Sequence, residues 1–377
     1  MGTPWYFLEI LRGCLSLNEQ RSTNSTESSK IVGNGFGKPY QHFCLGLDVC
    51  GREAVDILDA WKLIYNAFAT SNSQISNSYR KDMTILLQVR NMFQPENATV
   101  LTRLGGRQGL TQIIQNRDGH RVPCYTYNGG DTELPKMNTY LRDVAFFANR
   151  YGGLQTATNV LGGQGITSNS EWQVRAAAHM IRFIWDDNQS PNPTFVPTAF
   201  ELSYTNPNPF PNCRVDAQIG IDPNKIVCEF KSWGTRANEL NDEKDVDDPG
   251  KYTTAISSFE NFAFGYSSFG QFRCYLQQIS AIDKLRYYFD INRSGVSETY
   301  VKGIFQKLIY DNATNKLTPN GELVFDAIWG NTRGLKGNLF PDITDFTAST
   351  AKDEGLASFI SKVKNTSNSF YNFINVK

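Results

Sequence analysis

The chain has 377 residues, of which 37 are Lys or Arg and 37 are Asp or Glu, so its formal net charge is zero. Hydrophobic residues make up 40% of it and aromatic residues 13%, which indicates a folded chain with room for two domains or one large domain. This neutral balance argues against a protein that wraps long stretches of nucleic acid. A cleft that grips a few phosphates is compatible with it.

The N-terminal part, residues 1–165, is expected to be mainly helical, and nothing in it indicates a function. Apolar residues at helical spacing predict helices over residues 51–70, 80–93 and 137–150. Residues 152–170 are rich in Gly, Ser and Thr and are the best candidate for a domain boundary. The second domain is therefore expected at residues 166–377, and its C-terminal extension should contain helices over residues 298–311 and 355–374.

The seven cysteines are scattered and odd in number, so at least one is unpaired or pairs between chains. Cys228 and Cys274 fall in elements expected to be packed, where free thiols behave as small apolar groups, and this favours a reducing compartment. The apolar run in residues 1–20 lacks a basic start and is interrupted by Glu9 and Arg12. We therefore expect no membrane association, and a protein that is cytoplasmic or exported without a signal peptide.

Residues 167–187 predict a helix, because their apolar side chains recur at helical spacing. Ser168 followed three residues later by Glu171 fits a capping box. Glu171 could instead point toward a metal site, but capping explains it with no further assumption. The apolar stripe consists of Val174, Ala177, Ala178, Ile181, Ile184 and Trp185.

Residues 214–233 alternate as β-strands do, and residues 222–225 carry turn chemistry, so the segment predicts a two-stranded hairpin. With those four residues as the turn, Asp216 faces Lys231 and Gln218 faces Glu229. Side chains alternate along a strand, so these four residues are expected to share one face. The other face is expected to be core, formed by Ile219, Ile221, Ile226, Cys228 and Phe230.

Two carboxylates and a lysine on one sheet face are the minimum for metal-assisted cleavage of a phosphodiester. Mg²⁺ prefers carboxylate and water oxygens, and a nearby lysine can stabilise developing charge or help to deprotonate a water. The alternative interpretation is an ordinary cross-strand ion pair on a solvated sheet.

Residues 267–290 predict a long helix with a polar stripe. Gln271, Tyr275 and Gln278 follow the spacing i, i+4, i+7 and share one face, while Phe272, Leu276 and Ile279 on a neighbouring face are expected to pack. A glutamine and a tyrosine one turn apart can hydrogen-bond phosphates or stack on a base. The alternative is a helix with a mixed polar surface.

In this order, the motifs make the sequence similar to the PD-(D/E)xK nuclease superfamily, and within it to the RecB-like exonuclease branch. The branch is marked by an Asp, a (D/E)-x-K and a Q-x-x-x-Y, which here are Asp216, Glu229 with Lys231, and Gln271 with Tyr275. The resemblance covers roughly residues 165–295. It implies an α/β protein with a restriction-endonuclease-like αβββαβ core, a mainly helical N-terminal region and C-terminal helices.

The resemblance also implies the chemistry. Asp216 and Glu229 would bind Mg²⁺, with Mn²⁺ as a substitute, and Glu171 would be a further carboxylate near the metal. Lys231 would be the catalytic base or charge stabiliser, while Gln271 and Tyr275, with Gln218 beside them, would contact the substrate or support the site. The expected activity is metal-dependent hydrolysis of DNA.

Three biological roles are compatible with such an activity: repair, restriction, or a toxin carrying a nuclease domain. A toxin would have an immunity protein as a partner, and a delivery partner as well. The alternatives are an inactive nuclease fold that serves in binding, and a nuclease that acts on RNA.

Overall fold

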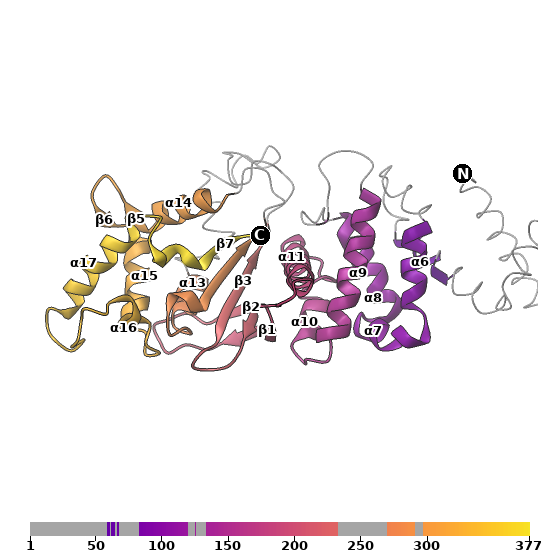
Figure 1. Cartoon of the computed structure of the whole chain (residues 1–377), viewed down its shortest axis with the longest axis horizontal. Helices are drawn as coiled ribbons and strands as arrows, with labels where there is room; N and C mark the ends of the chain where they lie inside the picture. Colours follow the sequence, from indigo (N-terminus) through magenta and orange to yellow (C-terminus); the bar gives the residue numbers. More distant parts are fainter. Residues whose placement is uncertain are drawn as a thin grey trace, which may run out of the picture. The chain divides into compact units, whose positions relative to one another are not determined.

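The computed structural model describes residues 83–119, 125, 133–232, 270–290 and 297–377, together with residues 59–60, 62–64 and 66–67. It is a mixed α/β protein with a helical N-terminal region, a five-stranded mixed sheet and C-terminal helices (Figure 1). None of the helices described is long and apolar enough to cross a membrane.

The chain divides into two compact units, residues 1–115 with 129–142 and residues 116–128 with 143–377. The domain limits expected from the sequence, 1–165 and 166–377, stay a prediction. Helices α8 and α9 contribute residues to both units. The helices of this N-terminal region are α6 (Met83–Met92), η1 (Pro95–Asn97), α7 (Ala98–Arg103), α8 (Gly106–Gly119) and α9 (Glu133–Tyr151).

The expected helices over residues 80–93 and 137–150 correspond to α6 and α9 and are confirmed. Of the expected helix over residues 51–70, the few residues described are helical. Residues 1–20 lie outside the described residues.

The second unit is built on a sheet of strand order β1-β2-β3-β4-β7. The first three strands are antiparallel neighbours, while β4 and β7 run parallel to β3. The sheet and its neighbours consist of α10 (Ala157–Leu161), α11 (Glu171–Asn188), β1 (Pro197–Tyr204), β2 (Cys213–Ile219), β3 (Ile226–Lys231), α13 (Gly270–Leu276), η3 (Ile282–Lys284), β4 (Leu285–Phe289) and β7 (Ile374–Val376).

The C-terminal part adds helices and a small hairpin: α14 (Glu298–Ile309), β5 (Tyr310–Asp311), β6 (Lys316–Leu317), α15 (Pro319–Trp329), α16 (Leu335–Leu339), α17 (Ala351–Val363) and η4 (Ser369–Phe373). Helix α14 confirms the prediction for residues 298–311. The helix expected over residues 355–374 ends at Val363, and the chain then returns through η4 to place β7 in the sheet.

The register of the β2–β3 hairpin differs from the predicted one by two residues. Ile219 pairs with Ile226 and Gln218 with Val227, so Gln218 does not face Glu229 and Asp216 does not face Lys231. The reason lies in the turn, where the Asn224 amide donates to the carbonyl of Ile221 (3.0 Å) and Gly220 has a positive φ of 70°. Ile221 consequently lies in the loop and is 76% exposed, not in the core.

The segment 267–290 also differs from its prediction. The helix ends at Leu276, and residues 285–289 form strand β4 instead of continuing it. Tyr and Phe side chains favour strands, and here they pair with β3 in the middle of the sheet, so tertiary pairing overrides the helical pattern. Gln278 therefore follows the helix and does not share its face with Gln271. The expected packing residues Phe272, Leu276 and Ile279 are buried.

Both faces of the sheet are covered. Helix α11 lies on one face, where the rings of His179 and Phe183 pack 5.5 and 5.6 Å from Phe230. The opposite face carries Leu285, Tyr287 and Phe289 and is covered by α13 and the C-terminal helices (Figure 1). The buried part of the predicted stripe on α11 consists of Val174, Ala177, Ala178, Ile181 and Ile184.

Helix α11 does not begin with the predicted capping box. Its N-cap is Ser170, and Glu171 is its first residue, so Glu171 is not at the third helical position. The hydroxyl of Ser168 accepts a hydrogen bond from the amide of Ser170 (2.9 Å). The side chain of Glu171 lies outside what the structure describes.

A disulfide joins Cys213 at the start of β2 to Cys274 in α13, across 61 residues of sequence. Cys274 is therefore not the free thiol that the sequence suggested, whereas Cys228 is free and buried. Cross-linking two distant residues lowers the conformational entropy of the unfolded chain. The bond ties the helix that carries Gln271 and Tyr275 to the strand that carries Asp216.

This bond predicts a stability that depends on reductant. We expect reduction to lower the free energy of unfolding by about 2–4 kcal/mol, measured by urea titration with and without a phosphine reductant. A Cys213→Ala variant should have the lower stability in both conditions. If the variant still responds to reductant as the parent does, another cysteine pair is responsible.

Candidate active site

Asp216 and Glu229 meet where the β2–β3 hairpin opens. The last backbone pair of the ladder is Ala217 with Cys228, and the same register continued by one residue places Asp216 opposite Glu229. A register shift of two residues keeps the side chains that remain in the strands on their predicted faces, because the period of a strand is two. Asp216, Glu229 and Lys231 therefore remain on one face despite the altered pairing.

The Asp216 side chain replaces the backbone ladder at this point. Its Oδ2 accepts a hydrogen bond from the Phe230 amide at 2.6 Å, so the carboxylate itself bridges β2 and β3. Its Oδ1 makes no hydrogen bond to the residues that the structure describes. One oxygen thus fixes the carboxylate in position, and the other is available to a ligand.

Glu229 is buried, with an exposed fraction of 2%, and it is surrounded by donors. Its Oε1 accepts hydrogen bonds from Lys231 Nζ (2.5 Å) and Gln271 Nε2 (2.8 Å). Its Oε2 lies 2.5 Å from the hydroxyl of Tyr275. A buried carboxylate is costly unless it is paired and hydrogen-bonded, and these three side chains meet that requirement.

Gln271 and Tyr275 lie one turn apart on α13 and use their polar atoms within the site. The amide oxygen of Gln271 accepts from Lys231 Nζ (3.1 Å), and its Nε2 also donates to the Tyr275 hydroxyl (2.8 Å). That hydroxyl also lies 2.7 Å from the carbonyl oxygen of Arg214. Gln271 and Tyr275 therefore support the site by orienting the side chains of Glu229 and Lys231.

Glu201 in β1 is a third carboxylate at the site, and the sequence pattern did not single it out. Its backbone has a φ of 48°, a conformation that a non-glycine residue seldom adopts. Its Oε2 forms an ion pair with Arg214 Nε at 2.7 Å, and its side chain is only 9% exposed. No sequence signal marked Glu201, because the unusual backbone angle depends on the folded sheet.

The carboxylates of Asp216, Glu229 and Glu201 are close enough for each to affect the pKa of another. Burial, followed by the charges of Glu229 and Glu201, raises the pKa of Asp216 well above its usual value. Burial raises the pKa of Glu201 to about 7 against the opposing effect of Arg214, and the charge of Glu229 adds to the rise. A cation beside Asp216 would relieve this repulsion, because opposite charge favours the ionised carboxylate.

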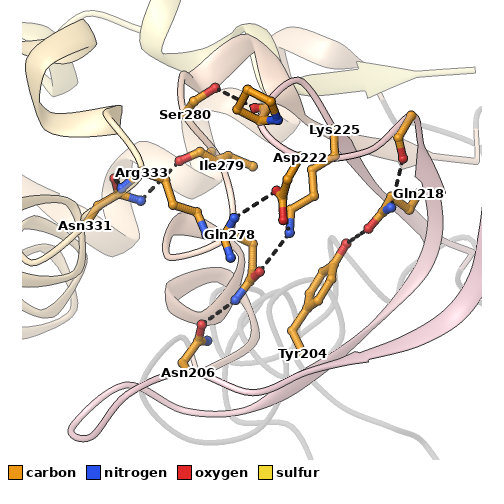
Figure 2. Close-up of polar contacts among 12 residues, drawn as sticks. Tyr204, Asn206, Gln218, Asp222, Lys225, Gln278, Ile279, Ser280, Asn331 and Arg333 are labelled. Atoms are coloured by element: carbon orange, nitrogen blue, oxygen red, sulfur yellow. Dashed lines mark hydrogen bonds and ion pairs between the residues drawn. The ribbon is translucent and has the colours of Figure 1, made fainter.

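Gln218 and Gln278 belong to a different polar cluster (Figure 2). Gln218 accepts from the hydroxyl of Tyr204 (2.6 Å), while Gln278 accepts from Lys225 (2.9 Å). The same cluster contains the ion pair of Arg333 with Asp222 (2.8 Å). It surrounds the loop before β3, whereas Glu229 and Lys231 lie at the far end of that strand.

The carboxylate oxygens of Asp216 and Glu229 fit a hard divalent cation whose other ligands are mainly water molecules. Among the described residues, no three His, Cys, Asp or Glu side chains converge on one metal position. Mg²⁺ usually needs only one or two carboxylates and keeps several waters. Asp216 and Glu229 supply the two carboxylates, and carboxylate oxygens have lone pairs beyond those used in the hydrogen bonds above.

No protein-family model, curated protein or solved structure matches the chain. We therefore infer the function from the geometry of Asp216, Glu229, Lys231 and their neighbours.

The raised pKa of Glu201 predicts a pH-dependent difference between the parent and a Glu201→Gln variant. A carboxyl whose pKa rises from 4.5 to about 7 on folding holds its proton better in the folded chain. The stability that it contributes is complete below pH 4.5 and is lost as the pH rises to about 7. We expect the variant to gain about 1–3 kcal/mol relative to the parent over this interval, measured by urea titration. A difference that does not change with pH would contradict it.

Proposed function

We propose that this protein is a metal-dependent nuclease that hydrolyses phosphodiester bonds of DNA. The observation that carries the proposal is the convergence of Asp216, Glu229 and Lys231 at the open end of one hairpin, with Glu229 and Lys231 oriented by Gln271 and Tyr275. The element order α11–β1–β2–β3–α13–β4 supports the restriction-endonuclease-like core expected from the sequence.

Asp216 Oδ1 and Glu229 would hold Mg²⁺ or Mn²⁺. Such an ion, when bound, polarises the scissile phosphate and lowers the pKa of a coordinated water. Glu171 would be a further carboxylate near the metal, as the resemblance implies.

Lys231 would act on the substrate directly. Two of its three N–H donors are directed to Glu229 and Gln271, and its side chain is 16% exposed. The third donor can bond a phosphate oxygen or the attacking water. Fixing the ammonium beforehand lowers the cost of orienting it in the transition state.

We expect Asp216→Asn and Lys231→Ala each to lower DNA cleavage by about 100-fold or more, since each removes a charge at the reacting centre. Cleavage is measured on linear and circular DNA and on RNA, with Mg²⁺, Mn²⁺ or EDTA. Mg²⁺ should also raise the melting temperature of the parent but not of Asp216→Asn, because a ligand stabilises only the fold that binds it.

The matched controls are Asp326→Asn and Lys352→Ala, which remove the same groups from an exposed ion pair between α15 and α17. Both should cut as the parent does. Full activity in Asp216→Asn and Lys231→Ala would show that the site is assigned wrongly. No cleavage by the parent with any metal would favour an inactive binding fold, and cleavage of RNA alone would change the substrate.

A further inference from the structure

Arg214 is a cation at the edge of the proposed site that the sequence motifs do not include. It lies in β2 two residues before Asp216, which corresponds to roughly 6.5 Å along a strand. Its guanidinium is paired with Glu201 and makes no ion pair with Asp216 or Glu229 among the described residues. The positive charge of Arg214 is therefore paired with Glu201 and not with the two carboxylates that would hold the metal.

Two acceptors hold this guanidinium in a fixed orientation. Nε is 2.7 Å from Glu201 Oε2, and Nη1 donates to Gln164 Oε1 at 2.5 Å. Glu201 reaches the guanidinium from a backbone with a φ of 48°, a conformation that is strained in a non-glycine residue. Backbone strain of this kind is often found at functional sites.

Arg214 makes no further side-chain contact among the described residues, so its remaining donors can bind a ligand. The two contacts use two of the five N–H groups of the guanidinium, and the side chain is 38% exposed. A planar fork of N–H donors matches two oxygens of one phosphate, and a preoriented fork loses little entropy when it binds. Arg214 and Asp216 lie two residues apart in β2, so their side chains share one face, and the two residues can contact neighbouring phosphates of one strand.

We propose that Arg214, oriented by Glu201 and Gln164, binds the substrate phosphate adjacent to the one that is cleaved. This inference rests on the proposed nuclease function, and it adds a preference for substrates with at least two phosphates. Arg214 is then a substrate-binding residue, while Glu201 and Gln164 are positioning residues.

The test compares Arg214→Gln with Arg333→Gln on two substrates. Arg333 is the matched control, because its side chain is also 38% exposed and pairs with one carboxylate, Asp222, at the other end of β3 (Figure 2). The substrates are a single-stranded DNA oligonucleotide and bis(p-nitrophenyl) phosphate, which has one phosphate and no neighbour.

We expect Arg214→Gln to lower kcat/KM on DNA by about 10- to 100-fold, through a higher KM, because it loses charge-assisted hydrogen bonds. Hydrolysis of the small diester should be unchanged, and Arg333→Gln should equal the parent on both. Arg214→Lys keeps the charge without the fork and should fall between the parent and Arg214→Gln. Urea titration checks that each variant is folded.

Binding of the same oligonucleotide in EDTA, followed by fluorescence anisotropy, tests the contact without cleavage. The slope of log Kd against log salt should be shallower by about 0.7 in Arg214→Gln, since one phosphate contact is lost. Equal binding and cleavage by parent and Arg214→Gln would overturn the inference. An equal loss on both substrates would also overturn it, by placing Arg214 at the reacting centre. A parent that binds DNA but does not cut it would reject the proposed activity. The anisotropy measurements would then still decide whether Arg214 contacts a phosphate.

Discussion

The buried carboxylate of Glu229 is the interaction on which the arrangement of the site depends. Burying a charge is costly, so each of its oxygens must be matched by a donor, and Lys231, Gln271 and Tyr275 supply them. These donors come from β3 itself and from α13, which ties the helix to the sheet. The disulfide between Cys213 and Cys274 makes the same connection covalently.

Beside Glu229, strands β2 and β3 stop pairing through their backbones. The backbone ladder of β2 and β3 ends after Ala217, and the Asp216 side chain takes over the bond to the Phe230 amide. The opening brings Asp216, whose Oδ1 makes no hydrogen bond to the described residues, beside Glu229, both of whose oxygens have hydrogen-bond partners. Burial, followed by repulsion from Glu229 and Glu201, keeps the pKa of Asp216 high, and a divalent cation beside it would relieve that repulsion.

The two ends of β3 have separate polar clusters. At its end, carboxylates, Lys231 and the paired Arg214 are grouped with side chains of α13. Before its start, Asp222 pairs with both Lys225 and Arg333, and Lys225 also donates to Gln278. The separation explains why Gln218 and Gln278, which share the sequence neighbourhood of the motif residues, do not contact Glu229.

The sequence alone determined which residues share a face, because the period of two along β2 and β3 survives a register shift of two residues. It also determined the α-helical N-terminal region and the buried stripe of α11, through hydrophobic spacing. Only the tertiary structure decided the hairpin register, the end of α13 at Leu276 and the position of Glu201, because these depend on a turn, a central strand pairing and a left-handed backbone angle. Such features arise from contacts between distant residues, which a local pattern does not contain.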